Sequence, residues 1–171
     1  QTGWVHSGFI SCQNVNLSTL PVVAGPPLPP TFTPTPTHTP VATPTPVVIT
    51  EWRGEYFANR DLAGSPALVR NDAEVNFDWG LGSPAEGIPA DDFGARWTRN
   101  VWFEGGQYRF RAIADELVRL WVDGELLINV WDDRQPGEIV ATRSLSQGEH
   151  SVRIDYAEHG GEARIRVGWE R

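Results

Sequence analysis

Two adjacent carboxylates, Asp115 and Glu116, are the residues of this sequence best placed to do chemistry. They stand at the end of a predicted strand and ahead of a predicted hairpin. A pair of carboxylates can bind a metal ion, or it can supply the acid and the base of glycoside hydrolysis. A simpler interpretation stays open, in which the two side chains only end the strand, remain hydrated and pair with Arg119.

The elements on either side of the pair are a strand and a hairpin. Between Gln107 and Ile113 polar and apolar residues alternate, which is typical of a strand with one buried face and one solvated face. Apolar runs then flank Asp123-Gly124. An Asp-Gly pair between two such runs predicts a type I′ hairpin, because both turn residues need positive φ. The sequence therefore predicts a strand, an acidic loop and a hairpin in succession.

A second candidate is Trp131, which precedes Asp132 and Asp133. A tryptophan ring beside carboxylates is suited to stacking on a sugar, with the oxygens accepting from its hydroxyl groups. Asn129 alternates onto the same face. The competing interpretation is that Trp131 is a core residue, because seven tryptophans in one small β-rich region are expected to be mostly buried.

Four further carboxylates carry weaker signals. Asp91 and Asp92 follow a Gly- and Pro-rich stretch and are expected to serve turn geometry. Glu158 and Glu162 flank the last predicted turn, and we expect both to be solvated.

Sequence motifs for catalysis are absent. The chain has no G-x-S-x-G, no H-E-x-x-H and no Cys/His cluster, and its single cysteine, Cys12, lies outside the β-rich region. We therefore predict that the chain is not an enzyme.

Charge and proline divide the chain into two parts. All 36 charged side chains lie from Glu51 onward, whereas ten of the 14 prolines lie within residues 21–46. The net charge of −8 disfavours nucleic acid and an anionic membrane surface as partners. No run approaches the roughly 18 apolar residues of a membrane span, so no membrane insertion is expected.

Three regions follow from this division. Residues 1–23 resemble the last strand and helical turn of a bacterial Src-homology-three-like (SH3-like) domain, and we interpret them as the C-terminal remnant of that small barrel. Residues 24–50 carry Thr-Pro repeats, which predict a disordered, extended Pro/Thr-rich linker because proline lacks a backbone donor. Residues 51–171 form the folded domain. Since the chain has no methionine, we expect it to be one module of a longer multidomain protein.

The folded domain is predicted to be all-β, an antiparallel β-sandwich or barrel of about nine strands, because turn signals recur about every ten residues and no helical period is sustained. Of the nine strands, the third is expected to turn into the fourth at Gly105-Gly106, and the eighth into the ninth at Gly160-Gly161. The predicted strands are Trp52 to Phe57, Glu74 to Trp79, Phe93 to Phe103, Gln107 to Ile113, Val118 to Val122, Leu126 to Val130, Ile139 to Ser144, His150 to Tyr156 and Ala163 to Trp169.

These strands carry a family resemblance that spans residues 51–171. Trp52 to Phe57 (WRGEYF) resembles the "x-G-x-Y-F" opening of the PA-fourteen (PA14) domain, the lectin-like β-domain named after anthrax protective antigen. Gly106 to Phe110 (GQYRF) is similar to its "G-x-Y-x-F", and Arg119 to Gly124 (RLWVDG) to its "L-x-x-D-G". Asp92 to Trp97 (DFGARW) and the closing segments from Gly148 to Trp169 match in the same order.

The resemblance implies a module that binds sugar through calcium. In such members two adjacent aspartates joined by a cis peptide follow the "Y-x-F" strand, and a loop near the C-terminus adds an amide. Here Asp115 and Glu116 align with the aspartates as metal ligands, and His159 and Gly160 occupy the facing loop. Calcium requires six to eight hard oxygens and can hold sugar hydroxyl groups in its open positions. A site for another metal, with His159 as a ligand, is a further interpretation.

We therefore predict a non-catalytic carbohydrate-binding module of a secreted or cell-surface bacterial protein, with calcium as a possible cofactor and a role in adhesion. Its expected partner is a glycan or a cell-surface polysaccharide, bound by Asp115, Glu116, Trp131, His159 and Gly160. Two alternatives stay open: a structural or protein-interaction spacer without a sugar site, and an accessory domain of a glycoside hydrolase.

Overall fold

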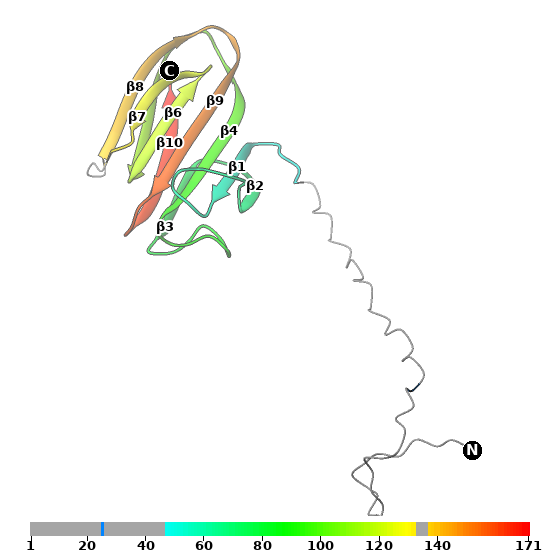
Figure 1. Cartoon of the computed structure of the whole chain (residues 1–171). Helices are drawn as coiled ribbons and strands as arrows, with labels where there is room; N and C mark the ends of the chain where they lie inside the picture. Colours follow the sequence, from blue (N-terminus) through cyan, green and yellow to red (C-terminus); the bar gives the residue numbers. More distant parts are fainter. Residues whose placement is uncertain (1–24, 26–46, 133–136) are drawn as a thin grey trace, which may run out of the picture. The chain divides into compact units, whose positions relative to one another are not determined.

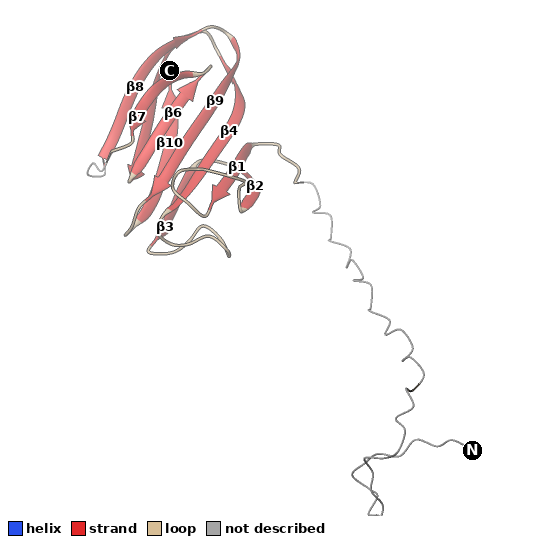
Figure 2. Ribbon diagram, viewed as in Figure 1, coloured by secondary structure: helices blue, strands red, loops and turns tan. Residues whose placement is uncertain are grey.

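The computed structural model describes residue 25, residues 47–132 and residues 137–171 (Figure 1). The predicted SH3-like remnant at residues 1–23 and most of the predicted linker lie outside the described residues, as does Asp133. The described part of the chain contains strands and loops and no helix (Figure 2). The all-β prediction is therefore confirmed. Within these ranges no helix is long and apolar enough to cross a membrane.

Ten strands form two antiparallel sheets that pack face to face as a sandwich (Figure 2). The six-stranded sheet has the order β2-β1-β4-β9-β6-β7, and the four-stranded sheet has the order β3-β10-β5-β8. The strands are β1 (Trp52–Phe57), β2 (Leu68–Asp72), β3 (Asn76–Gly80), β4 (Phe93–Phe103), β5 (Gly106–Asp115), β6 (Leu117–Val122), β7 (Glu125–Val130), β8 (Gly137–Leu145), β9 (Gly148–Glu158) and β10 (Ala163–Glu170).

The core lies between the two sheets and is strongly aromatic. Trp97 and Phe93 of β4, Tyr56 of β1 and Tyr156 of β9 are fully buried. Trp79 joins them through ring contacts with Tyr56, Phe93 and Tyr156, whose centroids lie 5.5–6.5 Å from its own. Aromatic pairs at such distances stabilise a core beyond the area that they bury. Alternate residues of each long strand therefore point inward and contribute their side chains to this cluster.

The predicted hairpin at Asp123-Gly124 is confirmed. It joins β6 to β7, and both turn residues have positive φ, 51° for Asp123 and 77° for Gly124. Asp123 also accepts a hydrogen bond from the backbone N–H of Ser151 (3.0 Å), which ties the turn to β9.

The two glycine pairs do not form hairpins within a sheet. Gly105-Gly106 connects β4 to β5, and Gly160-Gly161 connects β9 to β10, and in each case the chain passes from one sheet to the other. The predicted turns, from the third predicted strand into the fourth and from the eighth into the ninth, are therefore confirmed, and each passes between the two sheets. Alternation shows that a strand has a buried face, but it does not show in which sheet the strand lies.

Candidate functional site at the carboxylate rim

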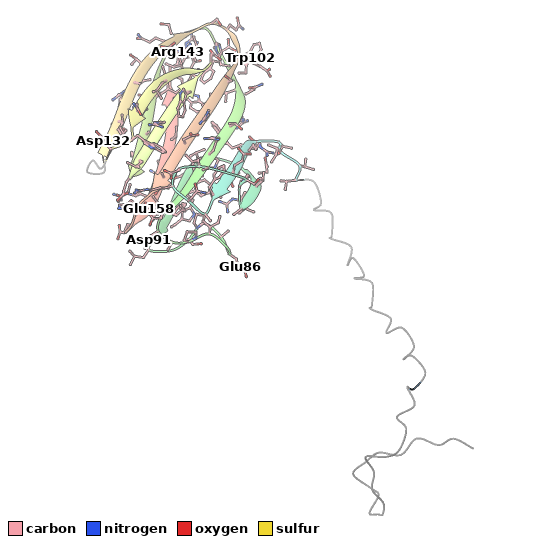
Figure 3. All side chains as sticks on the ribbon, in the orientation of Figure 1. Glu86, Asp91, Trp102, Asp132, Arg143 and Glu158 are labelled. Carbon is pink, nitrogen blue, oxygen red and sulfur yellow. The ribbon has the colours of Figure 1, made fainter. Side chains whose placement is uncertain are left out.

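The rim at one end of the sandwich is formed where β5 and β9 end. Asp115 is the last residue of β5, in the four-stranded sheet, and Glu158 is the last residue of β9, in the six-stranded sheet. Figure 3 shows Glu158 and Asp91 near the same end of the sandwich, away from Trp102 and Arg143. The rim is therefore a place where the two sheets bring acidic side chains together.

Asp115 and Glu116 are joined by a cis peptide bond. The backbone N–H of His159 donates to Glu116 Oε2 (3.0 Å), so the acidic pair and the facing loop are in direct contact. Asp115 Oδ2 lies 3.6 Å from the Arg164 guanidinium of β10. The structure thus brings Asp115, Glu116 and the His159 loop to one rim.

Arg119 does not pair with the acidic residues. Its Nε donates to Asn129 Oδ1 (2.9 Å), and its guanidinium lies 4.3 Å from the centroid of the Trp131 ring. The pairing considered from the sequence is therefore wrong, because Arg119 lies on the outer face of the six-stranded sheet.

Glu158 is fully buried, so the expectation that it is solvated is wrong. Burial, together with the nearby carboxylates of Glu116 and Asp115, raises the pKa of the Glu158 carboxyl to about 7. Its Oε1 atom is buried without a hydrogen-bond partner in the described part of the chain. Glu162, by contrast, is exposed as predicted. The rim therefore contains a carboxyl group, Glu158, whose ionised form is disfavoured by burial and by neighbouring negative charge.

The Tyr156 hydroxyl connects the two sides of the rim. It contacts the Asp115 carbonyl oxygen and lies 2.8 Å from Glu158 Oε2. Burial raises the pKa of Tyr156, with the negative charge of Glu158 as the next cause, so the phenol stays protonated. A hydroxyl has one proton for these two acceptors. A protonated Glu158 can donate to the Tyr156 oxygen and leave the phenol proton for Asp115, which satisfies the whole chain of contacts.

The loop before β4 completes the rim. His159 Nδ1 lies 2.7 Å from Arg60 Nη1 and 3.1 Å from Asp92 Oδ1. The backbone N–H of Gly161 donates to Asp91 Oδ1 (3.3 Å). Asp92 has a φ of 55°, which agrees with the predicted turn geometry. The two aspartates therefore serve the turn and also hold the His159 loop, a role that the sequence did not indicate.

The rim offers the right donor chemistry for a hard cation, because carboxylate oxygens are the preferred ligands of calcium. Within residues 47–132 and 137–171, however, no three His, Cys, Asp or Glu side chains converge closely enough to hold a metal ion. Glu116 Oε2 is occupied by the His159 N–H. A calcium ion at Asp115 and Glu116 therefore needs backbone carbonyls, water or sugar hydroxyl groups for its remaining positions.

Trp131 borders an open depression beside the rim, lined also by Arg60, Asp61, Leu117 and Asp132. Its ring is half-buried and is not part of the core between the sheets. Leu117 follows Glu116 directly, and Arg60 contacts His159, so this depression adjoins the carboxylate rim.

A second polar cluster at the other end of the sandwich has the residue types of a catalytic triad. His150 Nδ1 lies 2.6 Å from Asp123 Oδ2, and Ser146 Oγ lies 3.3 Å from His150 Nε2. His150 Nε2 is also 3.0 Å from the Ser146 carbonyl oxygen, so it acts as a donor there. The hydrogen bond to Asp123 raises the pKa of His150. Both ring nitrogens face acceptor oxygens, one of Asp123 and one of the Ser146 carbonyl, so this cluster fastens the hairpin turn.

The strand arrangement defines an antiparallel β-sandwich of ten strands in the described part of the chain. The chain belongs to the PA14 domain family, whose sequence model matches residues 52–171.

Known proteins similar to the chain include anti-sigma factors and a sugar-binding PA14 domain. The anti-sigma-I factor RsgI3 of Acetivibrio thermocellus is 35% identical over 119 residues, which cover 68% of this chain and 18% of that protein. The structure of an anti-sigma factor domain-containing protein is 34% identical with a TM-score of 0.66, covering 70% of this chain and 42% of that one. The PA14 sugar-binding domain from an RTX adhesin is 21% identical with a TM-score of 0.56, covering 72% and 90%. The chain thus spans under a fifth of the curated relative's length.

Proposed function

We propose that the chain is a non-catalytic carbohydrate-binding module, with Asp115 and Glu116 at the centre of a calcium-assisted sugar site. The observation that carries this proposal is the contact between Glu116 and the His159 loop, which joins the acidic pair to the facing loop at one rim. A cation there would offset the mutual repulsion of Asp115, Glu116 and Glu158. Sugar hydroxyl groups would complete its coordination, and Trp131 lies close enough to the rim to flank the sugar.

The relatives support a place for the chain as one module of a longer protein, because it covers 18% of the anti-sigma-I factor. The RTX adhesin domain is described as sugar-binding, although its likeness to this chain concerns the fold alone. The anti-sigma-I factor is the closer match in sequence and suggests a sensory rather than an adhesive setting. We propose that this module reports the presence of an extracellular polysaccharide to the rest of its chain.

The calcium site is tested by thermal melting with excess calcium and with a chelator. Binding to the native state alone adds about 2.7 kcal/mol at a hundredfold excess over the dissociation constant, which corresponds to a rise of several degrees in Tm. We expect this rise in the parent chain and its loss in Asp115→Ala. Glu162→Ala is the matched control, because this exposed carboxylate lies near the rim without contributing to it.

The sugar site is tested with the same variants by retention on a panel of polysaccharides in calcium. Asp115→Ala should lose retention while its Tm in chelator stays within a degree or two, since the Asp115 side chain pairs with an exposed arginine at a long distance, 3.6 Å. Unchanged retention in Asp115→Ala would remove the rim as the sugar site. An equal loss in Glu162→Ala would show that general negative charge, rather than the rim, is responsible.

A further inference from the structure

The outer face of the six-stranded sheet carries a second cluster of binding residues, separate from the rim. We call it the arginine-tryptophan face and define it by Arg96, Arg119, Trp121, Arg153 and Asp155, with Trp131 at its edge. Strand register brings these residues together, because Arg119 of β6 is paired with Asp155 of β9, and Asp155 with Arg96 of β4. Trp121 is paired with Arg153 in the same way.

One buried carboxylate fixes two of the arginines. Asp155 receives two hydrogen bonds from Arg96 (2.8 and 2.9 Å) and two from Arg153 (2.9 and 2.6 Å). Burial is the largest single influence on the pKa of Asp155 and raises it. The hydrogen bonds and charges of the two arginines together outweigh burial, so the pKa of Asp155 lies below its ordinary value. The guanidinium groups are therefore held in place before any ligand arrives, which reduces the entropy lost on binding.

The face is positive in an acidic domain. Three arginines surround the single carboxylate of Asp155, which gives a formal local charge of +2, whereas the chain as a whole carries −8. The adjacent Arg53 and Glu55 form an ion pair with each other (3.0 Å), so they add no net charge to the face. Arg153 keeps 43% of its side chain exposed, so the charge faces solvent.

Two tryptophan rings lie beside the arginines. The Arg153 guanidinium is 4.5 Å from the centroid of the Trp121 ring, and the Arg119 guanidinium is 4.3 Å from that of Trp131. Both rings are half-buried, so part of each faces solvent. Side chains with amides and hydroxyl groups occupy the surrounding outward positions, namely Thr98, Asn100, Asn129 and Ser151.

From this arrangement we propose that the arginine-tryptophan face binds an anionic polysaccharide, with its guanidinium groups on uronate carboxylates and its tryptophan rings on sugar rings. Arginine matches the geometry of a carboxylate with two parallel hydrogen bonds, and tryptophan offers a flat apolar surface. Trp131 belongs both to this face and to the depression beside the rim. The inference extends the proposed sugar binding to a second surface and does not require the rim or calcium.

A polysaccharide fits this face better than a protein partner. The centre of a protein interface is depleted in charge and enriched in apolar side chains. Here the centre is charged, and Thr98, Asn100, Asn129 and Ser151 beside it are polar. The exposed apolar residues of this face, Leu126 and Trp102, lie at its margins.

The test is affinity electrophoresis of the whole chain in chelator, through gels containing alginate, polygalacturonate or the methyl ester of the latter. We expect retention by both polyuronates and little by the ester, which has the same backbone without the charge. Arg119→Gln and Trp131→Ala should each weaken retention about tenfold, as expected for losing one charged hydrogen bond or one stacking contact. Added salt should weaken it as well, because salt screens exposed charges.

The matched control is Arg166→Gln on the other sheet. Arg166 Nε donates to Asn76 Oδ1 (2.9 Å), the same cross-strand contact that Arg119 makes with Asn129. Arg166→Gln and Asp115→Ala should both keep full retention, so a failed rim leaves this proposal standing. The proposal is overturned by no retention on either polyuronate, by equal retention on the methyl ester, or by an equal loss in Arg166→Gln.

Discussion

Asp72→Ala is expected to lower the free energy of unfolding by about 3–5 kcal/mol, because it removes the acceptor of three buried or half-buried donors. Asp72 is 6% exposed. It accepts hydrogen bonds from the Tyr56 hydroxyl (2.6 Å), Trp97 Nε1 (2.8 Å) and Arg70 Nε (2.6 Å). In the alanine variant these donors lose their acceptor and remain without a hydrogen-bond partner in an apolar environment.

This carboxylate matters to the rim because it holds the aromatic cluster in place. Tyr56 and Trp97, both bound to Asp72, contact each other edge to face with centroids 5.7 Å apart. Tyr56 also contacts Trp79, which in turn contacts Tyr156, the residue whose hydroxyl bridges the rim. Loss of Asp72 is therefore expected to loosen the packing on which the rim rests.

The measurement is urea or thermal unfolding of the parent and three variants. For a domain of this size the expected loss corresponds to a fall of roughly 10–20 °C in Tm. Tyr56→Phe, which removes one of the donors and leaves the carboxylate paired, should cost only about 1 kcal/mol. Glu74→Ala is the control for removing a carboxylate near the same strand end, since Glu74 is exposed. An Asp72→Ala variant as stable as Glu74→Ala would contradict the buried-network account.

Alternation in the sequence is sufficient to predict most of the strands, and the one it misses is instructive. β2 (Leu68–Asp72) is a short edge strand that ends in three polar residues, a composition typical of a loop. Its inward Asp72 is compatible with the core only because partners from β1 and β4 satisfy it. Those partners come from distant parts of the chain, which one sequence does not reveal.

The proximity of the acidic pair to the facing loop was predictable from the sequence, whereas the burial of Glu158 was not. The same two-residue period that places His150, Val152, Ile154 and Tyr156 on the inner face of β9 also places Glu158 there. Because carboxylates are rarely buried, Glu158 was nevertheless predicted to be solvated. The prediction for Arg119 was wrong for a related reason. It belongs to the outer face of one sheet, while Asp115 ends a strand of the other.

Glu158→Gln is expected to make the domain more stable than the parent at pH 8 and to remove part of its pH dependence. The pKa of Glu158 in the folded protein is about 7, above its ordinary value of 4.5. Because the pKa is raised, the folded state binds the Glu158 proton more tightly than the unfolded state does, and protonation therefore stabilises the fold. This contribution to the free energy of unfolding is about 3 kcal/mol. It is fully present below pH 4.5 and is lost as the pH rises through 7. Glutamine stays neutral and does not undergo this loss.

The difference between the two free energies of unfolding, measured in chelator from pH 4 to pH 8, isolates this residue. His150 also has a raised pKa, so its contribution is likewise lost as the pH rises, but it is the same in both proteins and cancels. Glu162→Gln should track the parent at every pH because Glu162 is exposed. A difference that does not change between pH 4.5 and pH 8 would show that Glu158 keeps its charge when folded. The buried Oε1 atom would then require a partner that the described residues do not supply, such as a bound cation or water.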